Sequence, residues 1–126
     1  MRDSIISGDL RRRLYDWKQT GEREYVCRID FSPSFRGFAG HFEGNPVVPG
    51  VCLIELVRVC AENVLKKNLK TDEILQCKFR SPALAGTSAQ CKLSIRPEND
   101  GKVKIQAEVR AGENIACQMR LKAGEI

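Results

Sequence analysis

Apolar and polar residues alternate along five stretches of the chain, as expected for β-strands with one buried face. The alternation is cleanest between residues 103 and 110, where the apolar side chains are Val103, Ile105, Ala107 and Val109. A proline or glycine soon follows each stretch and marks its end. The pattern predicts five strands over residues 24–31, 74–80, 88–96, 103–110 and 115–122.

Two other segments have apolar residues at helical spacing. A short helix is predicted between Asp9, its capping residue, and Gly21, with an apolar face made of Leu10, Leu14 and Trp17. A longer helix is predicted from about Pro49 to Lys67, since proline is tolerated in the first turn of a helix. The N-terminal half of the longer helix is apolar on almost every side, which is typical of a buried helix.

One long helix and about five strands that can pair antiparallel predict an α+β fold, with the sheet wrapped around the helix. The 126 residues fit one domain and are too few for two ordinary domains. We therefore expect a single domain over residues 1–126, in which residues 1–21 form a flanking N-terminal segment.

The composition is that of a globular protein, with 42% apolar and 29% charged residues. No segment is apolar enough for a signal sequence or a membrane span, so we expect a cytoplasmic protein without membrane contact. The six cysteines show no Cys-x-x-Cys spacing and are expected to be buried, reduced thiols. Because the chain has one histidine and no cluster of ligands, neither a metal nor another cofactor is expected.

The net charge of +5 favours an acidic partner. The basic residues are spread along the predicted strands, and aromatic residues make up only 6% of the chain. Surfaces that bind nucleic acid usually interleave aromatic side chains with a basic stripe, so nucleic acid is not expected as a partner.

The least ordinary stretch is the loop SPSFRGFAGHFEGNPVVPG and the helix that follows it. His41 lies in this loop, and Glu55 lies about one and a half turns into the apolar helix. A carboxyl group desolvated there should have a raised pKa and could donate a proton, while a neutral histidine could accept one. The N–H groups of Gly50 and Val51, in the first turn, could stabilise a carbonyl oxygen on which charge develops.

A structural interpretation of the same residues stays open on these patterns. Glu55 could pair with Arg58 three residues later, and Arg58, Glu62 and Lys66 would then continue as a solvated charged stripe along the helix. A single loop histidine is likewise more often a hydrogen-bonded residue than a catalyst. The spacing of these residues alone does not decide between catalysis and structure.

Two segments are similar to the signature of a known enzyme family. The string HFEGNPVVPGVCLIE resembles the motif His-Phe-x-Gly-x-Pro-x-x-Pro-Gly of the bacterial 3-hydroxyacyl-acyl-carrier-protein dehydratases. In that family an acidic residue follows the histidine by fourteen positions, and His41 and Glu55 have the same spacing. The segment KFRSPALAGT resembles a second family motif, Lys-Phe-Arg-x-Pro-x-x-x-Gly-Asp, and the whole resemblance covers roughly residues 24 to 122.

The resemblance implies a hotdog fold, in which a curved antiparallel sheet wraps a long helix, and a homodimer, alone or within a larger oligomer. In that family the histidine acts with the acidic residue of the other chain, so His41 and Glu55 would meet across the dimer. The N–H of Gly50 would bind the thioester carbonyl. The side chains expected to shape the tunnel for the acyl chain are Phe42, Pro49, Val51 and Val59.

The chain departs from the family at Val59, where the relatives often have a glutamine four residues after the acid. Two arginines that flank the catalytic segment, Arg36 and Arg58, are candidates for docking acyl carrier protein. The acidic surface of that partner would explain the basic charge of the chain.

The function that the resemblance implies is dehydration of 3-hydroxyacyl thioesters to trans-2-enoyl thioesters in fatty-acid-type biosynthesis. Acyl carrier protein is the expected carrier, with coenzyme A as an alternative. Two other functions stay open. One is an acyl-thioester hydrolase of the same fold, in which a glutamate on the helix activates water. The other is a non-catalytic hotdog subunit that binds a carrier protein or another hotdog chain, for which Val59 is the main argument.

Overall fold

The computed structural model describes residues 4–38 and 46–126, so His41 and Phe42 lie outside the described residues. In chain order, its elements are α1 (Ile5–Arg13), β1 (Leu14–Gly21), β2 (Glu24–Phe31), the short 3₁₀ helix η1 (Arg36–Phe38), α2 (Gly50–Leu65), β3 (Leu69–Phe79), β4 (Thr87–Pro97), β5 (Val103–Ala111) and β6 (Asn114–Glu125).

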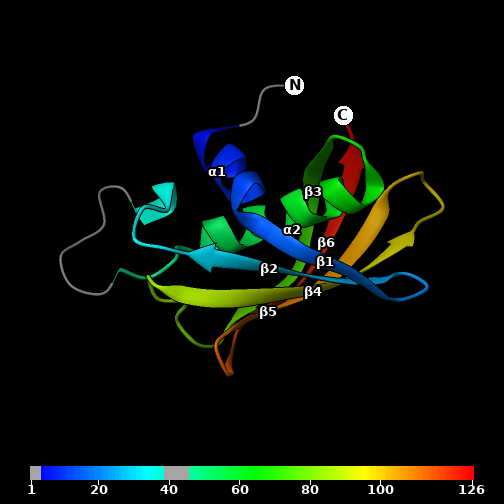
Figure 1. The fold of residues 1–126 in the computed structure, drawn as a ribbon. Helices are drawn as coiled ribbons and strands as arrows, with labels where there is room; N and C mark the ends of the chain where they lie inside the picture. The colour runs from blue at the N-terminus through cyan, green and yellow to red at the C-terminus, as the bar shows by residue number, and fades with distance from the viewer. Residues whose placement is uncertain (1–3, 39–45) are drawn as a thin grey trace.

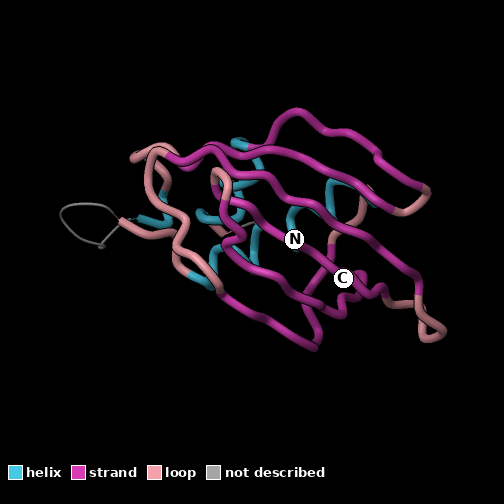
Figure 2. The backbone as a smooth tube through the Cα atoms, turned by 90° about the horizontal axis from the view of Figure 1, so that it is seen from below, coloured by secondary structure: helices cyan, strands magenta, loops and turns pink. Residues whose placement is uncertain are grey.

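The six strands in the described part of the chain form one antiparallel sheet, in the order β1-β2-β4-β5-β6-β3. The sheet curves around α2, and α1 lies against α2 on the same side (Figure 1). From below, the strands run side by side in front of the helices (Figure 2). The predicted α+β fold, with a curved sheet wrapped around a long helix, is confirmed.

The N-terminal helix is shorter than predicted, and the prediction that it reaches Gly21 is wrong. Ser4, not Asp9, caps α1: its side chain accepts a hydrogen bond from the N–H of Ser7. The chain then enters β1, in which the register with β2 shifts between Tyr15 and Lys18. This irregularity lets Leu14 and Trp17, three residues apart, both pack against the core. Their spacing therefore imitates that of a helix, although the backbone is extended.

β3 begins at Leu69, before the predicted start at residue 74. Its register with β6 shifts twice, between Thr71 and Glu73 and between Ile74 and Gln76. These shifts break the alternation of apolar side chains, so the first half of the strand carries no clear strand pattern. The other four predicted strands are confirmed to within a few residues of their ends.

The helix α2 follows the prediction closely. It begins at Gly50 after Pro49, and it ends at Leu65, where Lys66 adopts the left-handed conformation and donates its N–H to the carbonyl of Glu62 at 2.8 Å. Its fully or nearly fully buried apolar side chains are Cys52, Leu53, Leu56, Val57, Val59, Cys60 and Ala61. α2 is therefore the central helix of the core, as its apolar sequence predicts.

The core lies between α2 and the inner face of the sheet. Its largest fully buried side chains include Phe31, Ile29, Leu56 and Met119. All six cysteines are described and none forms a disulfide; five are buried and Cys77 is half-buried, as expected for reduced thiols. No helix within residues 4–38 and 46–126 is both long and apolar enough to cross a membrane.

Candidate functional site

Glu55 lies in the second turn of α2, with 33% of its side chain exposed. Its Oε2 accepts hydrogen bonds from Nη2 and Nε of Arg58, at 2.7 and 3.1 Å. The same oxygen accepts a third hydrogen bond, from the hydroxyl of Ser7 in α1, at 2.9 Å. Two helices thus hold a carboxylate that solvent can still reach.

The residues behind Glu55 form a buried ionic network. Arg58 donates through Nη1 to the carbonyl of Leu69 at 3.0 Å and pairs with Oε2 of Glu62, also at 3.0 Å. Glu62 also pairs with Nη2 of Arg11 at 2.9 Å and accepts the N–H of Leu69 at 2.7 Å. Because Arg58 and Glu62 are only 7% and 5% exposed, these charges are compensated by the protein and not by water.

This network corrects two predictions. The pair between Glu55 and Arg58 forms, but the stripe that continues from it is not solvated, because α1 and β3 pack over Arg58 and Glu62. For the same reason Arg58 is not exposed for docking a carrier protein, so that prediction is wrong. Arg36 is exposed in η1, and its docking role stays a prediction.

The surroundings of Glu55 also differ from the apolar environment expected from the sequence. The apolar residues of α2 face the sheet, whereas Glu55 faces α1 and meets the guanidinium of Arg58 and the hydroxyl of Ser7. Both groups are hydrogen-bond donors, which stabilise the charged form of a carboxyl group. Whether Glu55 donates a proton in a reaction therefore stays a prediction.

The N-terminus of α2 carries the predicted oxyanion residues Gly50 and Val51, and their role stays a prediction. Hydrogen bonds to the carbonyl of Pro49 begin with the N–H groups of Cys52 and Leu53, at 2.9 and 3.3 Å. The N–H groups of Gly50 and Val51 precede these and point beyond the end of the helix. A Cβ at Gly50 would come within 2.6 Å of the Phe79 ring, so glycine also serves the close packing of β3 on this turn.

Exposed apolar side chains surround this helix end. They are Val47, Val51, Phe79 and Leu84, with exposed fractions between 38% and 66%. Val47 forms an isolated β-bridge with Leu84, and the N–H of Val48 donates to the carbonyl of Ala83 at 2.7 Å. An exposed apolar cluster at the N-terminus of a helix can receive an acyl chain or a second subunit. Phe79 and Leu84 were not predicted as site residues, although both lie in the segment KFRSPALAGT.

The remaining predicted site residues are only partly placed. His41 and Phe42 lie outside the described residues, so their roles stay predictions. Pro49 is half-buried at the start of α2. Val59 is fully buried in the core, and its contact with an acyl chain also stays a prediction.

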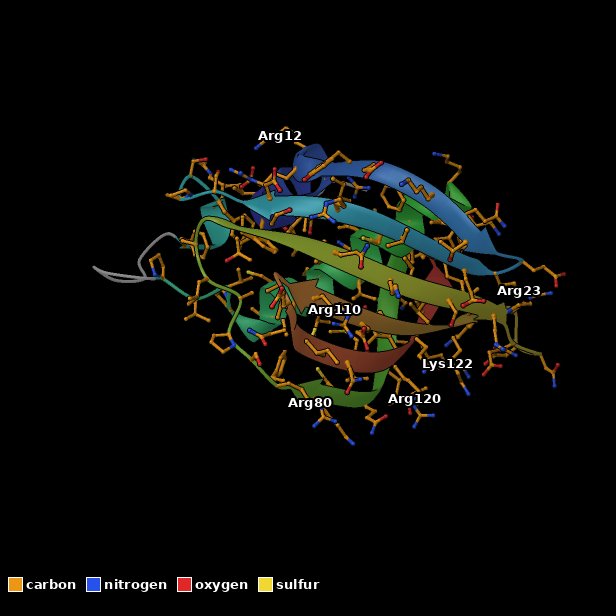
Figure 3. All side chains as sticks on the ribbon, turned by 60° about the horizontal axis from the view of Figure 1, so that its bottom comes forward. Arg12, Arg23, Arg80, Arg110, Arg120 and Lys122 are labelled. Carbon is orange, nitrogen blue, oxygen red and sulfur yellow. The ribbon has the colours of Figure 1, made fainter. Side chains whose placement is uncertain are left out.

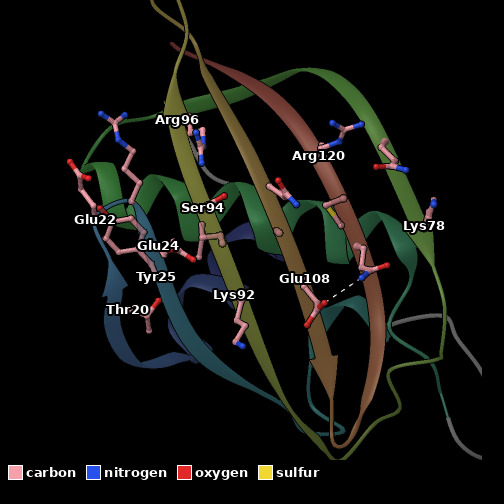
Figure 4. Close-up of a pocket in the computed structure, with 17 residues that line it drawn as sticks. Thr20, Glu22, Glu24, Tyr25, Lys78, Lys92, Ser94, Arg96, Glu108 and Arg120 are labelled. Carbon is pink, nitrogen blue, oxygen red and sulfur yellow. Dashed lines mark hydrogen bonds between the residues drawn. The ribbon is translucent and has the colours of Figure 1, made fainter.

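A large hollow of about 880 Å³ lies elsewhere, on the face of the sheet that points away from α2 (Figure 4). Five of its cations form no ion pair with any described residue: Arg23, Lys78, Lys92, Arg96 and Arg120. Glu108, which also lines it, is hydrogen-bonded to Gln118. Further basic side chains, among them Arg80 and Arg110, project from the same side of the molecule (Figure 3). The sheet separates this basic face from Glu55.

Comparisons with known proteins assign the chain to a family. A family model described as "ApeI-like: ApeI dehydratase" matches residues 17–120, which include most of the described sheet and all of α2. The chain belongs to this family. The ApeI-like match begins after α1, so Ser7 lies outside it.

Curated relatives of this ApeI-like chain are 3-hydroxyacyl-[acyl-carrier-protein] dehydratases FabZ. The protein from Levilactobacillus brevis is 38% identical over 105 residues, which cover 76% of this chain and 70% of that protein. The protein from Lactobacillus helveticus is 28% identical over 103 residues, with the same two coverages. For the protein from Alkaliphilus metalliredigens the identity is 34% over 92 residues, and the match spans 62% of that relative.

Solved structures support the hotdog fold of this ApeI-like chain. The dehydratase heterocomplex ApeI:P from Xenorhabdus doucetiae aligns with a TM-score of 0.73 at 22% identity, over 89% of this chain and 96% of that one. The PaaI protein of E. coli aligns with a TM-score of 0.69 at 14% identity, over 94% of this chain and 89% of that one. At these identities the likeness concerns the fold.

Proposed function

We propose that the chain is a hydro-lyase that removes water from 3-hydroxyacyl thioesters on acyl carrier protein, in fatty-acid-type biosynthesis in the cytoplasm. Membership of the ApeI-like dehydratase family supports this class of reaction. The observation that carries the proposal is the position of Glu55, a carboxylate reachable from solvent on the same helix as the N–H groups of Gly50 and Val51, which donate to no described residue.

The spacing of Gly50 and Glu55 along α2 would allow one substrate molecule to contact both residues. Glu55 follows Gly50 by five residues, or about 7.5 Å along the helix axis. Side chains on a helix lean toward its N-terminus, which brings the carboxylate closer to Gly50. A thioester carbonyl bound at Gly50 would therefore present its 3-hydroxyl toward Glu55, with the acyl chain against Val51 and Phe79.

In the proposed reaction, His41 of one chain takes a proton from C2 of the substrate. The electron pair moves toward the thioester carbonyl, whose oxygen is stabilised by the N–H groups of Gly50 and Val51. Glu55 of the other chain, in its protonated form, gives its proton to the hydroxyl on C3. The C–O bond breaks, water leaves, and a double bond forms between C2 and C3. A proton then returns from His41 to Glu55, directly or through water.

A second function is favoured by one specific observation, the ion pair between Glu55 and Arg58. An ionised Glu55 could accept a proton from a water molecule that attacks the thioester carbonyl, which would make the chain an acyl-thioester hydrolase. Both reactions would use the same carbonyl site at Gly50 and differ in the protonation state of Glu55.

Mass spectrometry of purified protein with a 3-hydroxyacyl thioester distinguishes the two reactions. A dehydratase yields an intact thioester that has lost one water, whereas a hydrolase yields free acid and free thiol. The variant Glu55→Gln keeps the shape of the side chain and should lose most of either activity, while the exposed Glu125→Gln serves as a matched control. A wild-type protein that converts neither 3-hydroxyacyl nor trans-2-enoyl thioesters would instead be a non-catalytic hotdog subunit.

A homodimer completes the proposal, since the site requires His41 from a second chain. β3 is an edge strand of the sheet, and it carries three exposed apolar side chains, Ile74, Leu75 and Phe79. An open strand edge with exposed apolar residues is suited to pairing with another chain. The similar structure from Xenorhabdus doucetiae is a dehydratase heterocomplex, so a different dehydratase chain is the alternative partner.

A further inference from the structure

The helix α1 lies outside the family match, yet one of its residues contacts Glu55 directly. We propose that Ser7 and Arg58 are positioning residues that fix the carboxylate of Glu55, which makes α1 part of the active site. This inference rests on the proposed function, because it assigns the two residues a role in the reaction of Glu55.

The hydroxyl of Ser7 is oriented by its own partners. Ser7 is 2% exposed, and its Oγ accepts hydrogen bonds from Nη2 of Arg58 and from Oγ of Ser4, both at 3.0 Å. A serine hydroxyl has two acceptor lone pairs and one proton. With both lone pairs engaged, its proton is directed to Oε2 of Glu55 at 2.9 Å.

The guanidinium of Arg58 is also held in place by several partners. Its planar guanidinium donates to Glu55 through Nε and Nη2, and to the carbonyl of Leu69 through Nη1. Glu62 pairs with the same Nη1 at 3.0 Å. Two donor nitrogens in one plane, Nε and Nη2, therefore define the position of Oε2 more closely than a flexible ammonium group would.

Burial separates the roles of these residues. Only 8% of the Arg58 side chain is exposed, against 33% of the Glu55 side chain. Ser7 is almost completely covered. A substrate that approaches from solvent can therefore touch Glu55, while Ser7 and Arg58 act through it.

Loss of either donor should have two separable effects. A less constrained Glu55 would be aligned less often with the leaving hydroxyl, which lowers kcat. The carboxyl would also be easier to protonate, because a donor to its charged form is gone, which moves the alkaline limb of the pH profile to higher pH. Among the described residues, the other charged or titratable groups that face this cluster are Glu62 and Cys52 in α2 and Arg11 in α1. Burial, followed by the charge of Glu55, raises the pKa of Cys52.

The test compares Ser7→Ala with Gly8→Ala, a substitution of matched size on the same turn of α1. A Cβ at Gly8 meets no atom within 4 Å, so this control changes the helix without changing the network. We expect Ser7→Ala to lower the plateau kcat about tenfold with KM changed less than about twofold, and to move the alkaline limb upward. Gly8→Ala should leave both quantities unchanged.

The variant Arg58→Lys covers the case in which Ser7→Ala fails to fold. It keeps a positive charge in the network and loses the planar fork, so kcat should fall about tenfold while the alkaline limb stays nearly in place. Equal kcat and equal pH profiles in wild type, Ser7→Ala and Arg58→Lys would overturn the positioning roles, even with dehydratase activity established.

A titration of the Glu55 carboxyl by carbon NMR tests the contacts of Ser7 and Arg58 with Glu55 without requiring catalysis. The Glu55 signal is assigned by its loss in Glu55→Gln. The Glu55 signal should titrate at higher pH in Ser7→Ala than in wild type and Gly8→Ala. If it does so in a protein that dehydrates no thioester, the contacts are real and the proposed function fails. An unchanged titration in Ser7→Ala would show that its hydroxyl does not act on Glu55.

Discussion

The buried network behind Glu55 should contribute strongly to stability, and Glu62→Gln tests this most cleanly. The substitution keeps the shape of the side chain and removes its charge. Glu62 is 5% exposed and lies 2.9 Å from Nη2 of Arg11 and 3.0 Å from Nη1 of Arg58. After the change, the buried guanidinium of Arg58 would lose one of its two carboxylate partners, and the side chain of Arg11, which is 37% exposed, would lose this partner at the surface.

The expected magnitude follows from burial. Removing one partner of a buried ion pair typically costs about 3–5 kcal/mol, because the other charge stays buried without compensation. Glu55 still neutralises Arg58 in the variant, so we expect the lower end, about 3 kcal/mol. The exposed pair of Lys67 and Glu125, at 3.6 Å, provides the control, and Glu125→Gln should cost less than about 1 kcal/mol.

Urea unfolding at one fixed protein concentration measures both changes, since the stability of an oligomer depends on concentration. With a slope of about 2 kcal/mol/M, the midpoint of Glu62→Gln should fall by about 1.5 M, and that of Glu125→Gln by less than about 0.5 M. Similar small shifts in the two variants would refute the argument that the network is desolvated and held together by charge.

Three further outcomes are expected. Burial alone would raise the pKa of Asp9, but hydrogen bonds from the N–H of Arg36 and from two arginine side chains lower it. Folding stability should therefore fall as the pH drops from about 5 to about 2, and acid denaturation should show a smaller loss in Asp9→Asn. Burial raises the pKa of Cys117 to about 12, so iodoacetamide at pH 8 should label half-buried Cys77 faster than buried Cys117 in the native protein, and equal rates at these two residues by mass spectrometry would contradict this. Activity with carrier-linked substrate should fall with salt more steeply than activity with a neutral thioester analogue, and less so in Arg36→Ala.

Most of the fold could be predicted from the sequence because its strands and central helix carry regular local patterns. The two segments that were not predicted as strands, in β1 and β3, contain irregularities of strand register. Asp16, with a positive φ of 58°, lies where the register of β1 shifts, and the shift places Leu14 and Trp17 on one face at a spacing typical of a helix. The first half of β3 lacks alternation for a similar reason.

The candidate site was predictable where its residues are close in the sequence. Gly50, Val51 and Glu55 belong to one motif and one helix, so their spacing fixes their relative placement. The contact between Ser7 and Glu55 joins residues 48 positions apart, and no local pattern indicates which face of α2 would meet α1. The burial of Arg58 depends on the same long-range packing, so the local sequence alone predicts a surface residue at this position.

The central claim, a dehydratase site built from His41 of one chain and Glu55 of another, is tested most directly by mixing two inactive variants. A mixed dimer of His41→Ala and Glu55→Gln has one site with both lesions and one site with neither. With random exchange about half of the dimers are mixed, so about a quarter of wild-type dehydration should return, by the two-fold symmetry of the dimer. Exchange is verified separately with a tag on one variant. No recovery in verified mixed dimers would contradict the shared site.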